Sequence, residues 1–156
     1  MPPTNPSRLQ VFVDVDVLFA GSVAPSQHGS NLVVFRLAEI TLIEAVASLQ
    51  VITKAVRNLA KKLPDALPAF RLIVSRCLRI VPDPEPADLA PFIGMADPKD
   101  LPILAAAVHE GCPWLVSFNG RHFQPGHPAV QVLPPGQLIL RVCERLAGLA
   151  AGLTGR

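Results

Sequence analysis

The segment that most constrains the fold is ADPKDLPILAAAVHEGCPWLVSFNGRHF, residues 96–123. Two carboxylates, Asp97 and Asp100, precede an apolar helix predicted over Leu101 to His109, and a short strand predicted over Pro113 to Ser117 follows. An acid, a helix, a strand and a polar turn in this order make up half of a βαβ unit. In a parallel sheet, ligands bind at the loops that follow the carboxyl ends of strands. Further site residues are therefore expected where the first strand ends.

The first strand is predicted from a nearly continuous apolar run, Leu9 to Val15, which is typical of a strand buried on both faces of a parallel sheet. Asp14 and Asp16 stand at the end of this run. A carboxylate among buried apolar residues is costly unless it is paired or bound to a metal ion. Capping of the next helix is the alternative, but it accounts for one acid and not for both. These two acids are therefore candidates for the same site as Asp97 and Asp100.

The rest of the chain alternates strands with helices, which predicts a parallel sheet with helices on both faces. The predicted fold class is α/β, a three-layer α/β/α sandwich with a central, mainly parallel sheet. The 156 residues are expected to form a single domain, 1–156, with a core over about 9–149 and flexible ends at 1–8 and 150–156. Further strands are predicted over Ile40 to Val46, Arg79 to Val81 and Val130 to Leu133, and further helices over Leu32 to Glu39, from Ser48, from Ala66 to Cys77 and from Gly136.

Composition narrows the class of protein. Half of the residues are apolar and the net charge at pH 7 is +2, which argues against disorder and gives no strong nucleic-acid signal. Three widely spaced cysteines, Cys77, Cys112 and Cys143, form no zinc-ligand pattern and are interpreted as buried thiols in a reducing compartment. The sequence shows no apolar signal core and no run of about 18 apolar residues. We expect a soluble, cytoplasmic protein.

Several charged residues have simple structural interpretations. Glu44, which lies among apolar neighbours in the second predicted strand, is expected to face solvent, with a buried partner as the alternative. Two groups of basic residues are interpreted as solvated helix faces. They consist of Lys54, Arg57, Lys61 and Lys62, and of Arg71, Arg76 and Arg79.

Asp14, Asp16, Asp97 and Asp100 are expected to converge at one edge of the sheet. Carboxylates that meet in one cleft repel one another unless a cation or a basic group balances them. Oxygen ligands with open water positions suit Mg²⁺ or Mn²⁺. Such an ion activates water for attack on a phosphodiester. These residues therefore favour metal-dependent phosphodiester hydrolysis.

Three motifs give the chain a family resemblance. VFVDVDVLFAG, DLPILAAA and CPWLVSFNGRHF resemble, in order, the strand-acid, acid-helix and strand-loop motifs of the PIN domain (PilT N-terminus), a nuclease fold found in VapC-type toxins and related ribonucleases. The resemblance covers about Leu9 to Pro135. It implies that Asp14 is the first acid of the family, that Asp100 is the third, and that Ser117 takes the place of a threonine.

The sequence also departs from the family pattern. In the helix after the second strand, SLQVITKAVRNL places Lys54 where the family has a glutamate. Asn119 stands at the fourth acidic position, and Asp16 replaces the usual asparagine.

Two interpretations follow from this pattern. In the first, a Mg²⁺ or Mn²⁺ ion is held by Asp14, Asp16, Asp97, Asp100 and Asn119, and RNA is cut with Asp14, Asp97 and Asp100 as catalytic residues. In the second, the Lys54 ammonium pairs with Asp14 or Asp100 and takes the place of the metal ion. The protein would then be an impaired PIN-like module that binds RNA or protein.

The resemblance also implies partners. RNA is the expected substrate, with phosphate contacts from Arg121 and His122. An antitoxin protein and a homodimer are the expected protein partners, and no membrane is involved. The apolar segment Leu138 to Leu149 is expected to pack into the core, with a dimer contact as the alternative.

Overall fold

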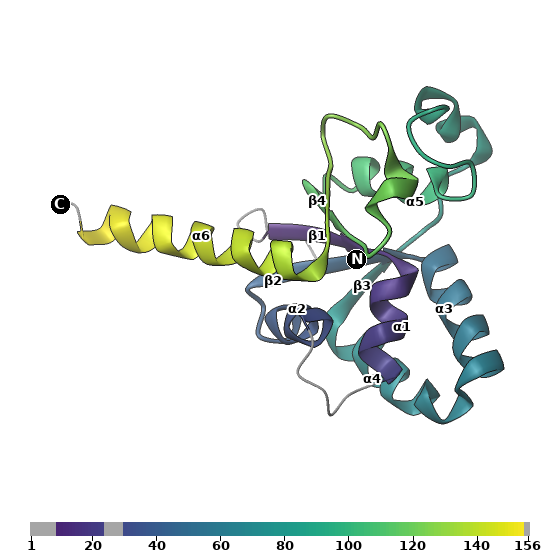
Figure 1. Ribbon diagram of the computed structural model, residues 1–156, viewed down its shortest axis with the longest axis horizontal. Coiled ribbons are helices and arrows are strands. Elements are labelled where there is room, and N and C mark those ends of the chain that lie inside the picture. Colours follow the sequence, from purple (N-terminus) through teal and green to yellow (C-terminus); the bar gives the residue numbers. More distant parts are fainter. Residues whose placement is uncertain (1–8, 24–29, 155–156) are drawn as a thin grey trace.

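A computed structural model describes residues 9–23 and 30–154. Five strands form one sheet, in which every neighbouring pair is parallel and the order is β3-β2-β1-β4-β5 (Figure 1). The predicted α/β fold class with a central parallel sheet is confirmed. The strands are β1 (Leu9–Val13), β2 (Ile43–Ser48), β3 (Leu78–Val81), β4 (Trp114–Val116) and β5 (Gln131–Leu133).

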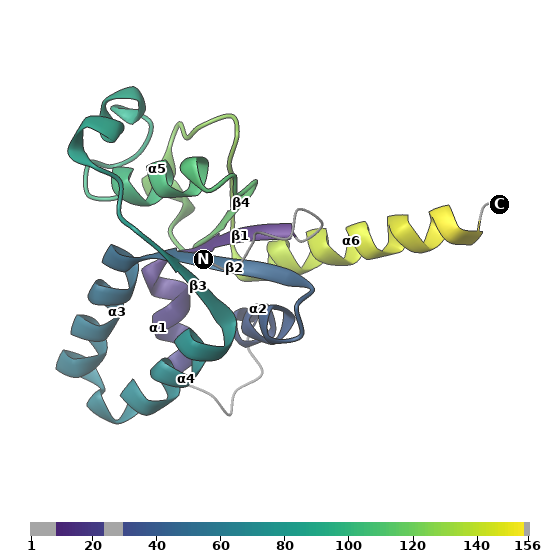
Figure 2. The same ribbon diagram turned by 180° about the vertical axis from the view of Figure 1, so that it is seen from behind.

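Helices cover both faces of the sheet, as the alternating pattern predicts. Helices α1 to α4 pack against one another on one face, and α5 packs with η2 on the other (Figures 1 and 2). Helix α6 packs on α2, β4 and β5. The helices are α1 (Val15–Val23), α2 (Ser30–Glu39), α3 (Leu49–Lys62), η1 (Pro64–Ala66), α4 (Leu67–Cys77), η2 (Pro86–Phe92), α5 (Leu101–His109), η3 (Gly120–Phe123) and α6 (Pro135–Thr154).

Strand β1 lies in the middle of the sheet between β2 and β4, and its last three residues are fully buried. Burial on both faces explains the continuous apolar run that predicts this strand. The strand ends at Val13 and not at the predicted Val15, because α1 begins at Val15. Asp14 is the single residue between them, and its backbone N–H still donates to the carbonyl of Val116 in β4, over 3.1 Å. The chain therefore turns into a helix at the carboxyl edge of the sheet.

Strand β2 begins three residues later than the predicted start at Ile40. The C-terminal turn of α2 continues through Ile40 and Leu42, whose backbone N–H groups donate to carbonyls of that helix. Thr41 closes this turn in the left-handed region, with φ of 65°. Leu9 pairs with Ile43, so the ladder to β1 sets the start of the strand.

Helix α5 has the predicted bounds, Leu101 to His109. Its small alanines and two larger residues, Ile103 and Leu104, are buried against the sheet. Gly111 ends the segment with φ of 69°, a conformation that favours glycine, and β4 starts three residues later. The local sequence is therefore enough to define this helix and its connection to the strand.

The solvent-facing interpretation of Glu44 is wrong. Arg79, on the neighbouring strand β3, donates through Nε to the Glu44 carboxylate and through Nη1 to Glu110 Oε2, over 3.1 Å. The side chains of Arg79 and Glu44 are each 12% exposed. Arg79 therefore lies in the predicted third strand and in a largely buried ion-pair network, and its assignment to a solvated helix face is wrong.

The three cysteines differ in environment. Cys112 is buried, and burial raises the pKa of its thiol to about 12. Cys77 is half-buried, whereas Cys143 lies exposed on α6, which corrects the prediction that all three are buried.

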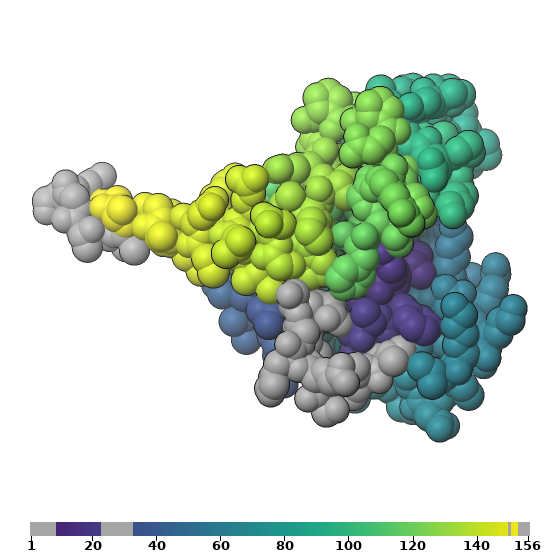
Figure 3. Space-filling view, in the orientation of Figure 1, coloured from purple at the N-terminus to yellow at the C-terminus, as the bar shows by residue number. Residues whose placement is uncertain are grey.

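Helix α6 has two halves with different surroundings. Leu138 and Val142 are buried, in line with the predicted core packing, whereas Leu146 and Leu149 are exposed. The second half extends away from the rest of the protein (Figure 3). The residues predicted as a flexible end are helical as far as Thr154, and 1–8 and 155–156 lie outside the described residues. Among the described helices, none is both long and apolar enough to cross a bilayer.

Candidate active site

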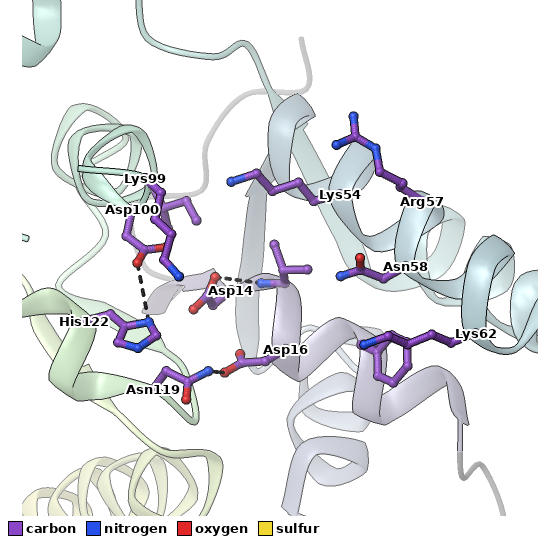
Figure 4. A pocket seen from close by; sticks show the side chains of 13 residues that line it. Asp14, Asp16, Lys54, Arg57, Asn58, Lys62, Lys99, Asp100, Asn119 and His122 are labelled. Carbon is purple, nitrogen blue, oxygen red and sulfur yellow. Dashed lines mark hydrogen bonds and ion pairs between the residues drawn. The ribbon is translucent and has the colours of Figure 1, made fainter. Parts of the chain in front are cut away.

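A cleft of about 530 Å³ opens where β1 gives way to α1 (Figure 4). Three carboxylates line it: Asp14 and Asp16 from the β1–α1 junction, and Asp100 from the start of α5. These segments meet because Asp14 and Asp16 follow β1 and Asp100 lies in the connection that follows β3, and the connections after parallel strands share one edge of the sheet. The predicted convergence of the acids is therefore found for these three.

Asp14 is the most buried of the three acids, with 7% of its surface exposed. Its Oδ1 accepts the backbone N–H of Val15 over 2.8 Å, and its Oδ2 accepts the hydroxyl of Ser117 over 2.8 Å. Burial and the nearby Asp16 raise the pKa of the Asp14 carboxyl to about 6, against which these hydrogen bonds act only partly. The site therefore holds a carboxylate whose negative charge is poorly compensated by the protein.

Asp16 is held by the loop after β4. Its Oδ2 accepts the backbone N–H of Phe118 over 3.0 Å and the amide of Asn119 over 2.8 Å, with the Ser117 hydroxyl at 3.4 Å. Its Oδ1 is buried and has no hydrogen-bond partner among the described residues. Burial raises the pKa of Asp16 despite these contacts. Ser117 and Asn119 thus orient the acids, and Asn119 contacts Asp16 through its nitrogen.

Asp100 occupies the N-cap position of α5, but its carboxylate does not cap the helix. Its Oδ2 is buried without a hydrogen bond among the described residues, and His122 Nδ1 lies 3.5 Å away. Burial raises the pKa of Asp100, while Lys99, His122 and Lys54 act in the opposite direction. A carboxylate that leaves its helix cap unmade and points into the cleft is available for a ligand (Figure 4).

Asp97 stands apart from the other three acids. It is exposed and does not line the cleft. Its backbone N–H donates to the carbonyl of His122, and one oxygen of its carboxylate lies within 4.8 Å of ligand atoms of Asp100 and His122. Asp97 therefore forms a group with Asp100 and His122, and it lies outside the cleft that the other three acids line.

The opposite wall of the cleft is basic. Helix α3 supplies this wall with Lys54, Arg57, Asn58 and Lys62 (Figure 4). A further lysine, Lys99, lines the cleft beside Asp100. The predicted position of Lys54 beside the acids is found, but among the described residues Lys54 makes no ion pair with a carboxylate. Arg57 and Lys62 are exposed, in line with the solvated-face interpretation, and they also line the cleft, whereas Lys54 is half-buried.

The two residues predicted to contact RNA lie in different places. His122 lines the cleft beside Asp100, whereas Arg121 is exposed and outside the cleft lining. Sequence reasoning missed Arg57, Asn58, Lys62 and Lys99 as site residues. The signal was present in the spacing of Lys54, Asn58 and Lys62 at every fourth residue of a helix, which places them in one row.

The fold and the site together define a class: a parallel α/β protein with an acidic site at the carboxyl edge of its sheet. The sequence model of the PIN domain matches residues 10–121, and the chain belongs to the PIN domain family. One chain of the crystal structure of VapBC2 from Rickettsia felis, bound to a DNA fragment from their promoter, superimposes with a TM-score of 0.61. The alignment covers 80% of this chain and 98% of that one at 16% identity, which shows a shared fold. No curated protein matches the sequence significantly.

Proposed function

We propose that this PIN domain is a ribonuclease of the VapC-like class that holds Mg²⁺ or Mn²⁺ at Asp14, Asp16 and Asp100. The observation that carries the proposal is the pair of buried carboxylate oxygens, Asp16 Oδ1 and Asp100 Oδ2, neither of which accepts a hydrogen bond among the described residues, although His122 Nδ1 lies 3.5 Å from Asp100 Oδ2. A buried charge without a partner is costly, and a hard divalent cation is the ligand that oxygen donors of this kind prefer. The chemistry of these oxygens therefore fits such an ion, and among the described residues Asp97, Asp100 and His122 are the group whose ligand atoms already lie within 4.8 Å of one another.

The ion, when bound, supplies a Lewis acid and an activated water for phosphodiester hydrolysis. The protein's own residues prepare the site. Ser117 and Asn119 hold Asp14 and Asp16 in fixed orientations, as ligands must be held for catalysis. Because the pKa of Asp14 is about 6, this carboxyl is mostly ionised at neutral pH and able to bind a cation. Asp97 and Asn119 remain proposed as further metal ligands, with Asp97 also a proposed catalytic residue, and Arg121 and His122 remain proposed RNA contacts.

An antitoxin partner is part of the same proposal, because the fold matches a chain of a VapBC2 structure. A homodimer is proposed from the family resemblance alone, and a cytoplasmic location from the cysteines and the lack of an apolar signal core in the sequence.

Mn²⁺ binding tests the proposal without requiring the RNA target. We expect calorimetric titration of the metal-free protein to give about one equivalent bound, and binding to be lost in Asp14→Asn and in Asp100→Asn. Both substitutions remove a ligand charge while keeping the shape of the side chain. Asp65→Asn is the matched control, because Asp65 is exposed and lies outside the cleft. Unchanged binding in either cleft variant would show that the assignment of the ligands is wrong.

Lys54 supports a second candidate function, a metal-free binding module, because its side chain lines the cleft on the wall that faces the acids. Lys54→Glu replaces a cation by a carboxylate at this position. We expect Mn²⁺ affinity to rise by about tenfold or more, since about 1.4 kcal/mol of charge interaction corresponds to a factor of ten. Lys61→Glu makes the same charge change on α3 outside the cleft lining and serves as control.

The two candidate functions give different results in this titration. Binding in the parent supports the nuclease. If Mn²⁺ binds only to Lys54→Glu, the lysine takes the place of the metal ion and the binding module is the correct function. Equal affinities in Lys54→Glu and Lys61→Glu would contradict a role for Lys54 in the site.

A further inference from the structure

The basic wall of the cleft is an ordered row of side chains. Lys54, Asn58 and Lys62 are spaced by four residues and form one ridge of α3, and all three line the cleft (Figure 4). The rise of about 1.5 Å per residue makes this row about 12 Å long. Arg57 adds a fourth polar side chain to the same wall. The row begins at Lys54, opposite Asp100, and leads away from the acids.

The charges of these side chains are not balanced in ion pairs by carboxylates of the described residues. Among the described residues, Lys54, Arg57 and Lys62 form no ion pair with a carboxylate. Lys62 lies over the ring of Phe19, with Nζ 5.8 Å from the ring centroid, and Phe19 lines the cleft as well. On the opposite wall, Asp14 accepts a hydrogen bond from Ser117 and Asp16 accepts one from Asn119, while His122 lies 3.5 Å from the Asp100 carboxylate. The positive charges are therefore available to an anionic ligand in the cleft.

The row of polar side chains faces the cleft because the apolar face of α3 packs into the core. Val51, Ala55 and Leu59 are fully buried in the core, and α3 packs beside α1, which carries Asp16. That packing turns the neighbouring ridge of α3 toward the β1–α1 junction. One wall of the cleft is then acidic and suited to a cation, and the other is basic and suited to phosphates. If one phosphate of a polyanion lies beside Asp14, Asp16 and Asp100, the phosphates that follow it in the chain lie along α3.

We propose that Lys54, Asn58 and Lys62 together with Arg57, called the basic ridge below, bind consecutive phosphates of a single-stranded RNA next to the position of cleavage. This proposal rests on the proposed ribonuclease function, whose site it extends. A single strand is favoured over a duplex because Asp14 lies at the bottom of the cleft with 7% of its surface exposed, so the backbone must enter it. A basic groove beside an aromatic ring is the usual way in which proteins follow a single strand.

Binding of fluorescein-labelled oligouridylate to the full chain tests this proposal. The measurement is fluorescence anisotropy in EDTA over a series of salt concentrations, so that neither metal nor cleavage is involved. Each phosphate contact contributes about 0.7 to the slope of log affinity against log salt for a single strand. We expect Arg57→Ala and Lys62→Ala each to reduce that slope by about 0.7 and to weaken binding.

Two matched controls separate the ridge from general surface charge. Arg71→Ala removes the same side chain from an exposed position on α4, and Lys61→Ala removes the adjacent lysine of α3; neither residue lines the cleft. We expect both controls to keep the parent slope. Equal losses within the pair Arg57 and Arg71, or within the pair Lys62 and Lys61, would overturn the proposal, as would absence of binding by the parent. Equal affinity for a duplex RNA of the same length would overturn the preference for a single strand.

The outcome is independent of the metal experiment. If Mn²⁺ fails to bind but the ridge variants still differ from their controls, the nuclease proposal fails and the RNA-binding ridge stands. If Mn²⁺ binds and the ridge variants match their controls, the ridge proposal alone fails.

Discussion

The Asp14→Asn variant is expected to be more stable than the parent by up to about 3 kcal/mol in metal-free buffer at pH 8. In the parent, burial and Asp16 raise the pKa of Asp14 from its ordinary 3.8 to about 6. At about 1.4 kcal/mol per pKa unit, the folded state is destabilised by about 3 kcal/mol when this group is ionised. Asparagine keeps an oxygen that can accept the Val15 N–H, and it carries no charge.

The sign of the pH dependence follows from the two pKa values. Below about pH 3.8 both folded and unfolded chains carry the proton, and Asp14 adds no pH dependence. Between pH 3.8 and about 6 the unfolded chain loses the proton while the folded chain keeps it, so stability falls as pH rises. Above pH 6 the destabilisation is complete. The stability difference between Asp14→Asn and the parent should therefore be small at pH 4 and largest above pH 6.

Urea unfolding of both proteins in EDTA from pH 4 to pH 8 measures this difference. Asp65→Asn is the control and should stay within about 0.5 kcal/mol of the parent, as surface substitutions do. Addition of Mn²⁺ should stabilise the parent and not Asp14→Asn, because only the parent keeps the proposed site. A parent that is as stable as or more stable than Asp14→Asn at pH 8 would show that the charge of Asp14 is already compensated by the protein.

Replacement of Arg79 by methionine is expected to lower the free energy of unfolding by about 3–5 kcal/mol, the usual effect of removing one partner from a buried ion pair. Arg79 donates to both Glu44 and Glu110, and Arg79 and Glu44 are each 12% exposed. Without the guanidinium, the Glu44 carboxylate remains in the sheet with no balancing charge. The measurement is urea unfolding at pH 7.

A double variant separates the loss of the pair from the loss of packing. Arg79→Met with Glu44→Met places two apolar side chains where the pair was, and should recover most of the lost stability. Arg71→Met is the control, because Arg71 is exposed on α4 and has no ion pair among the described residues. A double variant as unstable as Arg79→Met would show that the arginine acts through its packing.

Much of the fold follows from patterns that are local in the sequence. Helix α5 keeps its predicted bounds because its apolar run, the acid before it and Gly111 after it are all local signals. The predicted strand limits near Ile40 and Val15 are wrong, because pairing with β1 and the early start of α1 fix those ends. Apolar residues continue beyond the end of β1 and precede the start of β2, so apolar character alone does not predict where the backbone hydrogen bonds of a strand begin or end.

The candidate site was only partly predictable for the same reason. The meeting of Asp14, Asp16 and Asp100 follows from the predicted parallel sheet, since the connections after parallel strands meet at one edge. The contact of Asn119 with Asp16 and that of Arg79 with Glu44 join residues 103 and 35 positions apart. The hydrophobic periodicity of one segment cannot predict which distant residue its polar side chains will contact.

The sequence by itself predicted the alternation of strands and helices, the parallel sheet and the edge at which Asp14, Asp16 and Asp100 gather, but not helix α1. Hydrophobic periodicity is sufficient for this, because it states which face of each element must be buried. Only the tertiary structure determined which residues lie opposite the polar faces of the helices. Lys54 and Lys62 form a solvated ridge in an isolated helix, and they become one wall of a cleft only because α3 packs beside α1.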